Sequence, residues 1–174
     1  MFYMTVDPNS LILTLHPDPI LREIGEEVDP KDENVQAVAK RMVEIMFEYN
    51  GIGLAAPQVG LPWRIFVTRD PEDEECAVVW INPKLEVLCE EIESEEEGCL
   101  SLPEIRGDIR RPNAIRITGY DIQGNQASSE SDDIIARIWQ HENDHLDGIL
   151  IIDKMSTMDK LVNRKLIRNL ERTQ

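Results

Sequence analysis

The run His-Glu-Asn-Asp-His that begins at His141 constrains this chain more than any other feature. On a helix, His141 and His145 lie one turn apart on one face, so both imidazoles can bind the same metal ion. Glu142 then lies at the edge of that face, where its carboxylate can reach water on the metal without being a ligand. Ile134 and Ile138 precede His141 at helical spacing, which predicts apolar and dry surroundings. The alternative is two core histidines that lie four apart by chance, and with three histidines in the chain we favour the metal site.

A catalytic site of this kind needs a third protein ligand as well as an open position. No suitable residue follows the pair closely. Ile151 stands where one known pattern of this type has its third histidine, and Glu171 lies near the end of the chain. The third ligand is therefore expected upstream, where four residues could supply it: His16, Cys76, Cys89 and Cys99.

Among the four, Cys99 is the residue that we favour. It follows Gly98, which lets the backbone approach closely, and a thiolate suits a borderline-soft divalent metal. The other three have simpler interpretations: His16 as a structural histidine in a proline-rich stretch, Cys76 as part of an exposed acidic loop, and Cys89 as a buried apolar residue.

Hydrophobic periodicity and turn residues predict the order of secondary structure. Apolar positions at helical spacing predict helices at about residues 33–49, 132–146 and from 156 onward. We expect Asn50-Gly51 to end the first helix, and Ser131 and Ser156 to cap the other two. Strand signals cover four short segments: residues 64–68, 77–81, 85–89 and 114–120.

This order is not the alternation of strand and helix that a parallel sheet requires, so we expect an α+β fold. Antiparallel or mixed β-sheets should pack around a central metal-binding helix, with an N-terminal helix and a C-terminal helix beside them. The length of 174 residues is that of one ordinary domain, so residues 1–174 are expected to form a single catalytic domain.

The charge of the chain excludes several classes of partner. With 34 acidic against 18 basic residues the net charge is −16, which disfavours binding to DNA and to anionic membrane surfaces. Residues 1–10 lack the basic region of a signal peptide, and no run of residues resembles a membrane span. Three cysteines without paired spacing favour a reducing compartment, so we expect a cytoplasmic protein.

Charged residues are also clustered along the chain. Acidic clusters at residues 73–75 and 90–97 are interpreted as a solvated loop and an exposed strand edge. Glu97 either holds the adjoining Cys99 loop by hydrogen bonding or merely extends the acidic run. Residues 160–174 contain five basic residues and one acidic residue, a charge of +4. This basic segment could dock on ribosomal RNA or pair with the acidic body of the chain.

Three stretches of the sequence together resemble the peptide deformylase family: GIGLAAPQ at residues 51–58, EGCLS at 97–101 and QHENDH at 140–145. They occur in the family's order, and the resemblance extends from about residue 11, through HPDPILR at 16–22, to the end of the chain. The helix expected at the C-terminus is similar to that of the bacterial type. The resemblance implies a metal-dependent hydrolase that removes the formyl group from the N-terminal formyl-methionine of new polypeptides and releases formate.

The resemblance also implies a role for individual residues. The metal ligands match Cys99, His141 and His145, and the catalytic carboxylate matches Glu142. The donors that polarise the formyl oxygen match the Gln58 side-chain amide and the Leu100 backbone N–H. The substrate-binding positions match Gly53, Ile52, Arg106, Ile134 and Ile138. The resemblance favours Fe²⁺ as the metal, although a Cys/His/His set also accepts Zn²⁺, Ni²⁺ or Co²⁺.

Several of these residues have other interpretations. Gln58 could cap a turn, and Arg106 could be an ordinary exposed arginine. Two other functions are open as well: a metallopeptidase that cuts internal peptide bonds, and a non-catalytic metal-binding factor associated with the ribosome. Ile151 counts against the first function. Glu142 and Gln58 together count against the second, because holding a metal requires neither of them.

Overall fold

A computed structural model describes residues 5–173, which form the α+β fold that the order of elements predicts. The strands are β1 Gly53–Ala55, β2 Ile65–Arg69, β3 Ala77–Cys99, β4 Leu102–Tyr120 and β5 Gln126–Ser131. The α-helices are α1 Glu33–Glu48, α2 Ile134–Leu146, α3 Ile151–Lys154 and α4 Thr157–Thr173. Three short 3-10 helices are η1 Pro8–Ser10, η2 Pro19–Arg22 and η3 Ala56–Val59.

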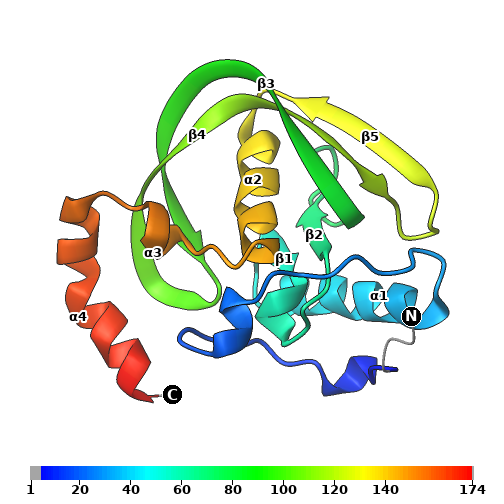
Figure 1. Ribbon diagram of the computed structural model, residues 1–174, viewed down its shortest axis with the longest axis horizontal. Helices are drawn as coiled ribbons and strands as arrows, with labels where there is room; N and C mark the ends of the chain where they lie inside the picture. The colour runs from blue at the N-terminus through cyan, green and yellow to red at the C-terminus, as the bar shows by residue number, and fades with distance from the viewer. Residues whose placement is uncertain (1–4, 174) are drawn as a thin grey trace.

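Helix α2 lies at the centre of the fold, within the curve of the long β3–β4 hairpin (Figure 1). The strands form one antiparallel sheet in the order β1-β2-β3-β4-β5. The sequence is compatible with either an antiparallel or a mixed sheet. Among residues 5–173 the only parallel pairing outside the named strands is an isolated bridge between Glu26 and Trp63. The curved hairpin covers α2 on one side, and β1 and β2 approach it from the other (Figure 1).

Helix α1 follows its prediction closely. Asp32 caps it, because the Asp32 side chain accepts hydrogen bonds from backbone N–H groups of the first turn. One face of the helix is buried in the main core: Val35, Val38, Ala39, Met42, Ile45 and Met46. The chain leaves the helix through Asn50, whose φ of 53° is left-handed. This turn leads directly into β1, beside α2.

The β3–β4 hairpin extends much further than the sequence predicts. The predicted strands 77–81 and 85–89 are parts of β3, and the segment predicted at 114–120 is only the end of β4. No strand is predicted at β5. Residues 90–96, beyond the predicted strand 85–89, are all exposed and show no hydrophobic alternation, so pairing with the β4 backbone forms the strand there. The exposed edge expected at 90–97 is therefore present, except that Glu97 is buried.

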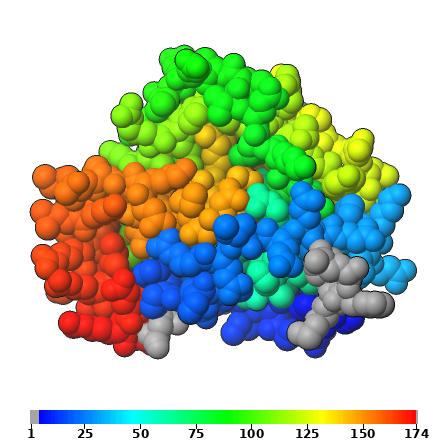
Figure 2. Space-filling view, in the orientation of Figure 1, coloured from blue at the N-terminus to red at the C-terminus, as the bar shows by residue number. Residues whose placement is uncertain are grey.

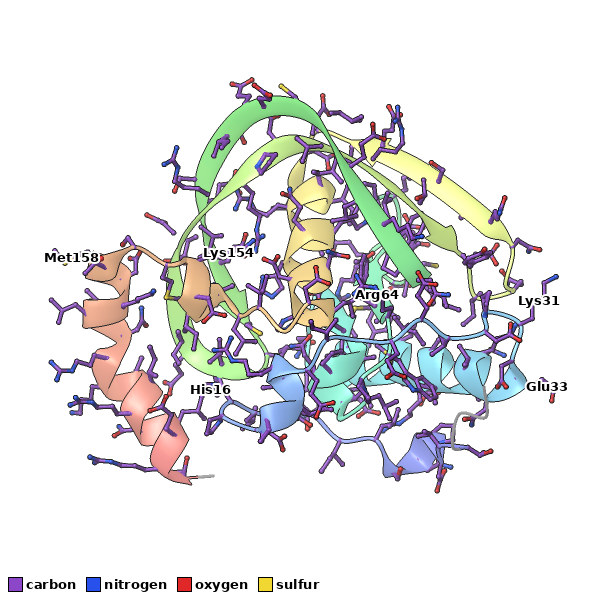
Figure 3. All side chains as sticks on the ribbon, in the orientation of Figure 1. His16, Lys31, Glu33, Arg64, Lys154 and Met158 are labelled. Carbon is purple, nitrogen blue, oxygen red and sulfur yellow. The ribbon has the colours of Figure 1, made fainter. Side chains whose placement is uncertain are left out.

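Helix α2 begins at Ile134, two residues later than expected. Asp133 rather than Ser131 is its N-cap, and the Ser131 hydroxyl donates to the Asp133 carboxylate at 2.7 Å. At the other end, Arg64 donates to the Leu146 carbonyl at 3.2 Å and contacts Asp147 at 2.9 Å (Figure 3). Both ends of the metal-binding helix predicted from the sequence are thus fixed by polar side chains.

Helix α4 is capped by Ser156 as predicted, since the Ser156 hydroxyl accepts the Asp159 N–H at 3.0 Å. It packs against β4 and lies at one edge of the molecule, orange to red in Figure 2. Part of its apolar stripe is exposed, including Met158 at the periphery of Figure 3. Residue 174 of the basic segment lies outside the described residues, as do residues 1–4 of the N-terminal segment. Among residues 5–173, no helix has both the length and the apolar character needed to cross a bilayer.

Candidate metal centre

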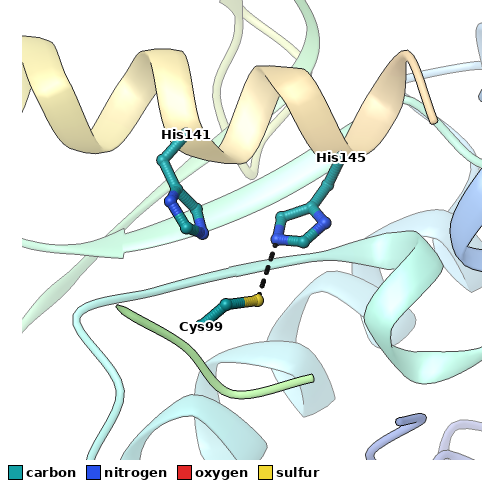
Figure 4. Close-up of side chains that lie close together, drawn as sticks. All are labelled: Cys99, His141 and His145. Atoms are coloured by element: carbon teal, nitrogen blue, oxygen red, sulfur yellow. Dashed lines mark hydrogen bonds between the residues drawn. The ribbon is translucent and has the colours of Figure 1, made fainter. Parts of the chain in front are cut away.

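Three side chains, two from α2 and one from β3, lie close together in the structure. Cys99 is the last residue of β3, and His141 and His145 lie on α2. One ligand atom from each residue lies within 4.8 Å of the others, and all three side chains point toward a common space (Figure 4). Cys99 Sγ is 3.4 Å from His145 Nε2. The structure therefore brings together the two histidines and the upstream cysteine that the chemistry favours.

The other upstream candidates lie away from this cluster. Cys76 is exposed, as predicted, and its Sγ lies 3.3 Å from an Asp73 carboxylate oxygen. Cys89 is exposed as well, so its interpretation as a buried apolar residue is wrong: this part of β3 has no covering layer. His16 is buried, and its Nε2 lies 3.2 Å from Glu171 on α4, which agrees with a structural histidine.

Glu97 orients one of the two histidines. Its carboxylate is buried and accepts a hydrogen bond from His141 Nδ1 at 2.9 Å. Arg111 donates to both carboxylate oxygens, at 2.6 and 2.9 Å. Burial alone would raise the pKa of Glu97, but hydrogen bonds from Arg111 and His141 outweigh it and hold that pKa well below its usual range. Glu97 therefore does not merely extend the acidic run, but its carboxylate bonds to His141 and Arg111 in the described structure and not to the Cys99 loop as the other interpretation expected.

Two buried arginines complete this network, and the sequence did not single out either of them. Arg111 also contacts Asp144 at 2.8 Å, and Lys154 lies 2.9 Å from the same carboxylate. Arg137 donates to Glu97 at 2.8 Å and to two backbone carbonyls of the hairpin. A signal for Arg137 was present, since it lies one helical turn before His141. The sequence holds no such signal for Arg111, because an arginine in a strand is ordinarily interpreted as exposed.

The two imidazoles have different environments. Burial lowers the pKa of His141, but hydrogen bonds to Cys99 and Glu97 outweigh it and raise the pKa to about 10. Burial and the neighbouring His141 hold the pKa of His145 well below its usual value. The Nδ1 atom of His145 is buried without a hydrogen-bond partner. A thiol and two imidazoles in one buried cluster are a donor set that suits a borderline-soft divalent metal.

Glu142 lies next to the cluster and is buried. Its Oε2 atom has no hydrogen-bond partner among residues 5–173, and burial raises the pKa of Glu142 to about 7. Gly53 on β1 lies so close that a methyl group built there would be 2.8 Å from the carboxyl carbon of Glu142. The strand can approach this carboxylate only because residue 53 has no side chain.

Gln58 combines the two interpretations that the sequence allows. Its Oε1 accepts the Ala55 N–H at 2.9 Å and so closes the turn of η3. Its Nε2 donates to the Ser101 hydroxyl at 3.1 Å and lies 3.5 Å from Cys99 Sγ. The Ser101 hydroxyl donates in turn to the Thr14 carbonyl at 2.7 Å. The turn thereby holds the amide donor directly beside the three candidate metal ligands.

A cavity of about 720 Å³ opens beside this cluster. The expected oxyanion donors Gln58 and Leu100 line this cavity. So does every residue expected to contact the substrate: Ile52, Gly53, Arg106, Ile134 and Ile138. Ile52 and Ile134 are 56% and 57% exposed, so the cavity presents apolar surface. Arg106 is exposed at the rim, with Nη1 3.8 Å from Glu96. Gln140 donates to the backbone carbonyls of Pro112 and Ala136.

The combination of a buried ligand cluster, an unpartnered carboxylate oxygen and an adjoining apolar cavity suits hydrolysis at a divalent metal. Fold and site together define a metal-dependent hydrolase. Comparison with known proteins then identifies the family within this class. Residues 11–161 match the family model described as polypeptide deformylase, and the chain belongs to this family.

Individual relatives agree along most of their length. The peptide deformylase of Thermotoga maritima is 42% identical over 156 residues, which cover 90% of this chain and 93% of the relative. That of Rhizobium meliloti is 38% identical over 160 residues, covering 90% and 89%. A crystal structure of the Plasmodium falciparum peptide deformylase superimposes with a TM-score of 0.87 at 41% identity, covering 93% of this chain and 96% of that chain.

Proposed function

We propose that this chain removes the formyl group from the N-terminal formyl-methionine of newly made polypeptides, as one catalytic domain of residues 1–174 that acts in the cytoplasm. The observation that carries the proposal is the cluster of Cys99, His141 and His145 beside the buried Glu142, next to an apolar cavity. Membership of the polypeptide deformylase family supports the same reaction.

The proposed metal ligands are Cys99, His141 and His145, with Fe²⁺ as the native ion and Zn²⁺, Ni²⁺ or Co²⁺ as ions that the same donors accept. When bound, such an ion supplies Lewis acidity and lowers the pKa of water towards about 7, which makes hydroxide available at neutral pH. Glu97 accepts a hydrogen bond from the Nδ1–H group of His141, and this tautomer leaves Nε2 of the same ring free to act as a ligand.

Glu142 is proposed as the group that moves the proton. Its carboxylate accepts a proton from the water that adds to the formyl carbon. It then returns this proton to the nitrogen as the carbon–nitrogen bond breaks, so the products are formate and a free methionine amine. The unpartnered Oε2 atom supports this role, because one buried acceptor has no other hydrogen bond to make.

Two donors are proposed to stabilise the negative charge that develops on the formyl oxygen. One is the Gln58 amide, which hydrogen bonds to Ala55 and Ser101 hold in place beside Cys99. The other is the backbone N–H of Leu100, a residue that lines the cavity. Donors fixed in advance stabilise a developing oxyanion without reorganising during the reaction.

The cavity is proposed to bind the first residue of the substrate. The side chains of Ile52, Ile134 and Ile138 would cover that of methionine, which explains why apolar surface is exposed there. Strand β1 pairs only with β2 in the described sheet, so the free edge at Gly53 can pair with an extended peptide. Arg106 at the rim would contact the peptide backbone further along.

The experiment that tests this proposal measures formate release from a formyl-methionyl tripeptide. Chelator-stripped protein is assayed without oxygen, before and after Fe²⁺ is added, with Zn²⁺, Ni²⁺ and Co²⁺ in parallel. We expect turnover only after metal is added. Protein that binds one metal per chain and yet releases no formate would favour the non-catalytic metal-binding factor.

An assay of the same protein preparation distinguishes the metallopeptidase function from the deformylase function. An unformylated peptide of the same sequence, with a blocked amino terminus, should remain intact while the formylated peptide is consumed. Cleavage of its internal bonds would instead favour the metallopeptidase.

We also propose that the basic helix α4 contacts ribosomal RNA. Its five basic side chains are exposed, and its acidic residue Glu171 contacts His16. Among residues 5–173, none of the five basic residues of α4 forms an ion pair within 4.0 Å, although Lys160 lies near enough to Asp153 to lower the pKa of that carboxyl group. Ribosome co-sedimentation at low salt should fall when α4 is removed, and unchanged co-sedimentation would contradict this contact.

A further inference from the structure

Arg137 is a charged residue between two apolar residues, Ile134 and Ile138, in the cavity wall that α2 forms. It shares one face of α2 with Ile134, Ile138 and His141, because these positions recur at helical spacing. All four side chains line the cavity, yet Arg137 is 8% exposed. The charge of its guanidinium group must therefore be balanced within the protein.

The guanidinium group binds the hairpin at four points. Nη1 donates to Glu97 Oε1 at 2.8 Å and to the Ile109 carbonyl at 2.9 Å. Nη2 donates to the Glu93 carbonyl at 3.0 Å, and Nε lies 3.4 Å from a Glu95 carboxylate oxygen. Arg137 thus joins α2 to both strands of the hairpin, where Glu95 of β3 pairs with Ile109 of β4.

This part of the hairpin extends beyond the rest of the sheet. Strand β3 pairs with β2 only as far as Ile81, and beyond that residue its described partner is β4 alone. Residues 86–96 are exposed, so no layer covers them from outside. Side chains that bridge α2 and the hairpin therefore contribute to the distance between them. Gln140 donates to β4 at the Pro112 carbonyl, whereas Arg137 makes bonds to both strands.

Holding Glu97 is not what makes Arg137 necessary. Arg111 already donates to both oxygens of Glu97, at 2.6 and 2.9 Å, and fixes the plane of that carboxylate. The contacts that Arg137 alone supplies are those to the Glu93 and Ile109 carbonyls. Glu93 and Ile109 do not line the cavity themselves, but they belong to the strand pair that continues into the lining residues Glu96 and Glu97.

We propose that Arg137 is a specificity-determining residue, which fixes the width of the cavity that binds the first side chain of the substrate. This inference rests on the proposed function. Because the guanidinium group is bound to the hairpin, the arm cannot move away from α2, and the cavity favours a slim, unbranched side chain such as methionine over a bulky aromatic one. All three guanidinium nitrogens have partners on the hairpin, so the polar end of Arg137 does not compete for the substrate side chain.

The test compares two tripeptides that differ only in the first residue, formyl-Met-Ala-Ala and formyl-Phe-Ala-Ala. The ratio of their kcat/KM values does not depend on the fraction of active enzyme, so partial misfolding cannot change it. R137M keeps the volume of the side chain and removes its hydrogen bonds. R116M is the matched control, because Arg116 also joins neighbouring strands, through Glu86 and Glu130, on an exposed part of the sheet.

We expect R137M to lower the preference for methionine about tenfold, mainly through KM, since pocket fit discriminates substrates by such factors. R137K should lower it about threefold, because an ammonium group replaces only part of the fork. R116M should keep the wild-type ratio. A ratio for R137M within twofold of wild type overturns the proposal, and if R137M does not fold, the same criterion is applied to R137K.

Cobalt binding separates this role from an effect on the metal. R137M should bind one Co²⁺ per chain with the wild-type absorption spectrum, because Arg111 still holds Glu97. A changed absorption spectrum, or less than one Co²⁺ bound per chain, would show that Arg137 acts on the metal ligands and would overturn the proposal. Wild-type protein that releases no formate from either peptide would defeat the proposed function itself. An unchanged ratio in an active variant would defeat only the role of Arg137.

Discussion

Replacing Gly53 by alanine should displace the proposed proton-transfer group without touching a metal ligand. A methyl group on residue 53 would lie 2.8 Å from Cδ and 3.0 Å from Cγ of Glu142, and nearer still to Oε1. Ordinary contact begins at 3.4 Å, so the overlap with Cδ alone is 0.6 Å. Strand β1 is held by pairing with β2, and Glu142 lies on a buried face of α2. The carboxylate must therefore move by more than half an ångström, towards 1 Å.

The cost of this movement follows from the geometry that proton transfer requires. A displacement of about 1 Å at a reacting group can lower the rate about a hundredfold. That factor corresponds to about 2.7 kcal/mol of transition-state stabilisation. We therefore expect G53A to lower kcat/KM for a formyl-methionyl tripeptide about a hundredfold, with most of the loss in kcat.

Formate release by metal-loaded G53A, with metal content measured on the same sample, checks this prediction. G25A is the control, because its methyl group would meet the Trp63 backbone at 3.2 Å, a much smaller overlap that lies away from Glu142. G25A should keep kcat/KM within about twofold of wild type. A G53A enzyme within threefold of wild type would refute the reasoning, since Glu142 would then tolerate a displacement that a proton-transfer group cannot.

Three further substitutions test other parts of the site. E142A should keep one metal per chain while turnover falls by about 10²–10⁴-fold, and turnover within tenfold of wild type would contradict its role. Q58L should lower kcat about 10²–10³-fold with little change in KM, and a loss confined to KM would contradict its role as an oxyanion donor. R111M leaves the buried carboxylate of Glu97 with too few partners, so urea unfolding of the metal-free protein should show a loss of about 3–5 kcal/mol, and a loss below 1 would contradict this account. Because the pKa of Glu97 is held low, its contribution to stability is complete above the ordinary glutamate pKa of about 4.3 and is lost as the pH falls below it. R111M should therefore show a smaller loss of unfolding free energy in acid than wild type.

The metal-binding helix and the first helix were predictable because their patterns are local. His141 and His145 share a face through helix geometry alone, and the apolar face of α1 recurs with the same period. The choice of Cys99 from four candidates rested on chemistry, and the structure places it alone of the four beside both histidines. These predictions required no knowledge of how distant segments pack.

The outer arm of the hairpin was not predictable from its own residues. Residues 90–96, beyond the predicted strand 85–89, are exposed on both faces, and Gly107 and Arg111 interrupt the hydrophobic alternation of the inward positions of β4. The strand exists because its backbone pairs with β4, and that pairing is not encoded as a pattern of side chains. Cys89 was misjudged for the same reason, since no layer covers this part of β3.

The buried charge network shows the same division most clearly. By itself the sequence determined which groups were available for the chemistry: two imidazoles and a carboxylate on one helix, a thiol after a glycine, and an amide in a turn. Tertiary structure alone decided that Glu97, from an acidic run, is buried between Arg111 and Arg137 and orients His141. The physical reason is that the environment of a charge depends on what folds over it, and the arginines that cover Glu97 lie 14 and 40 residues further along the chain, on β4 and α2.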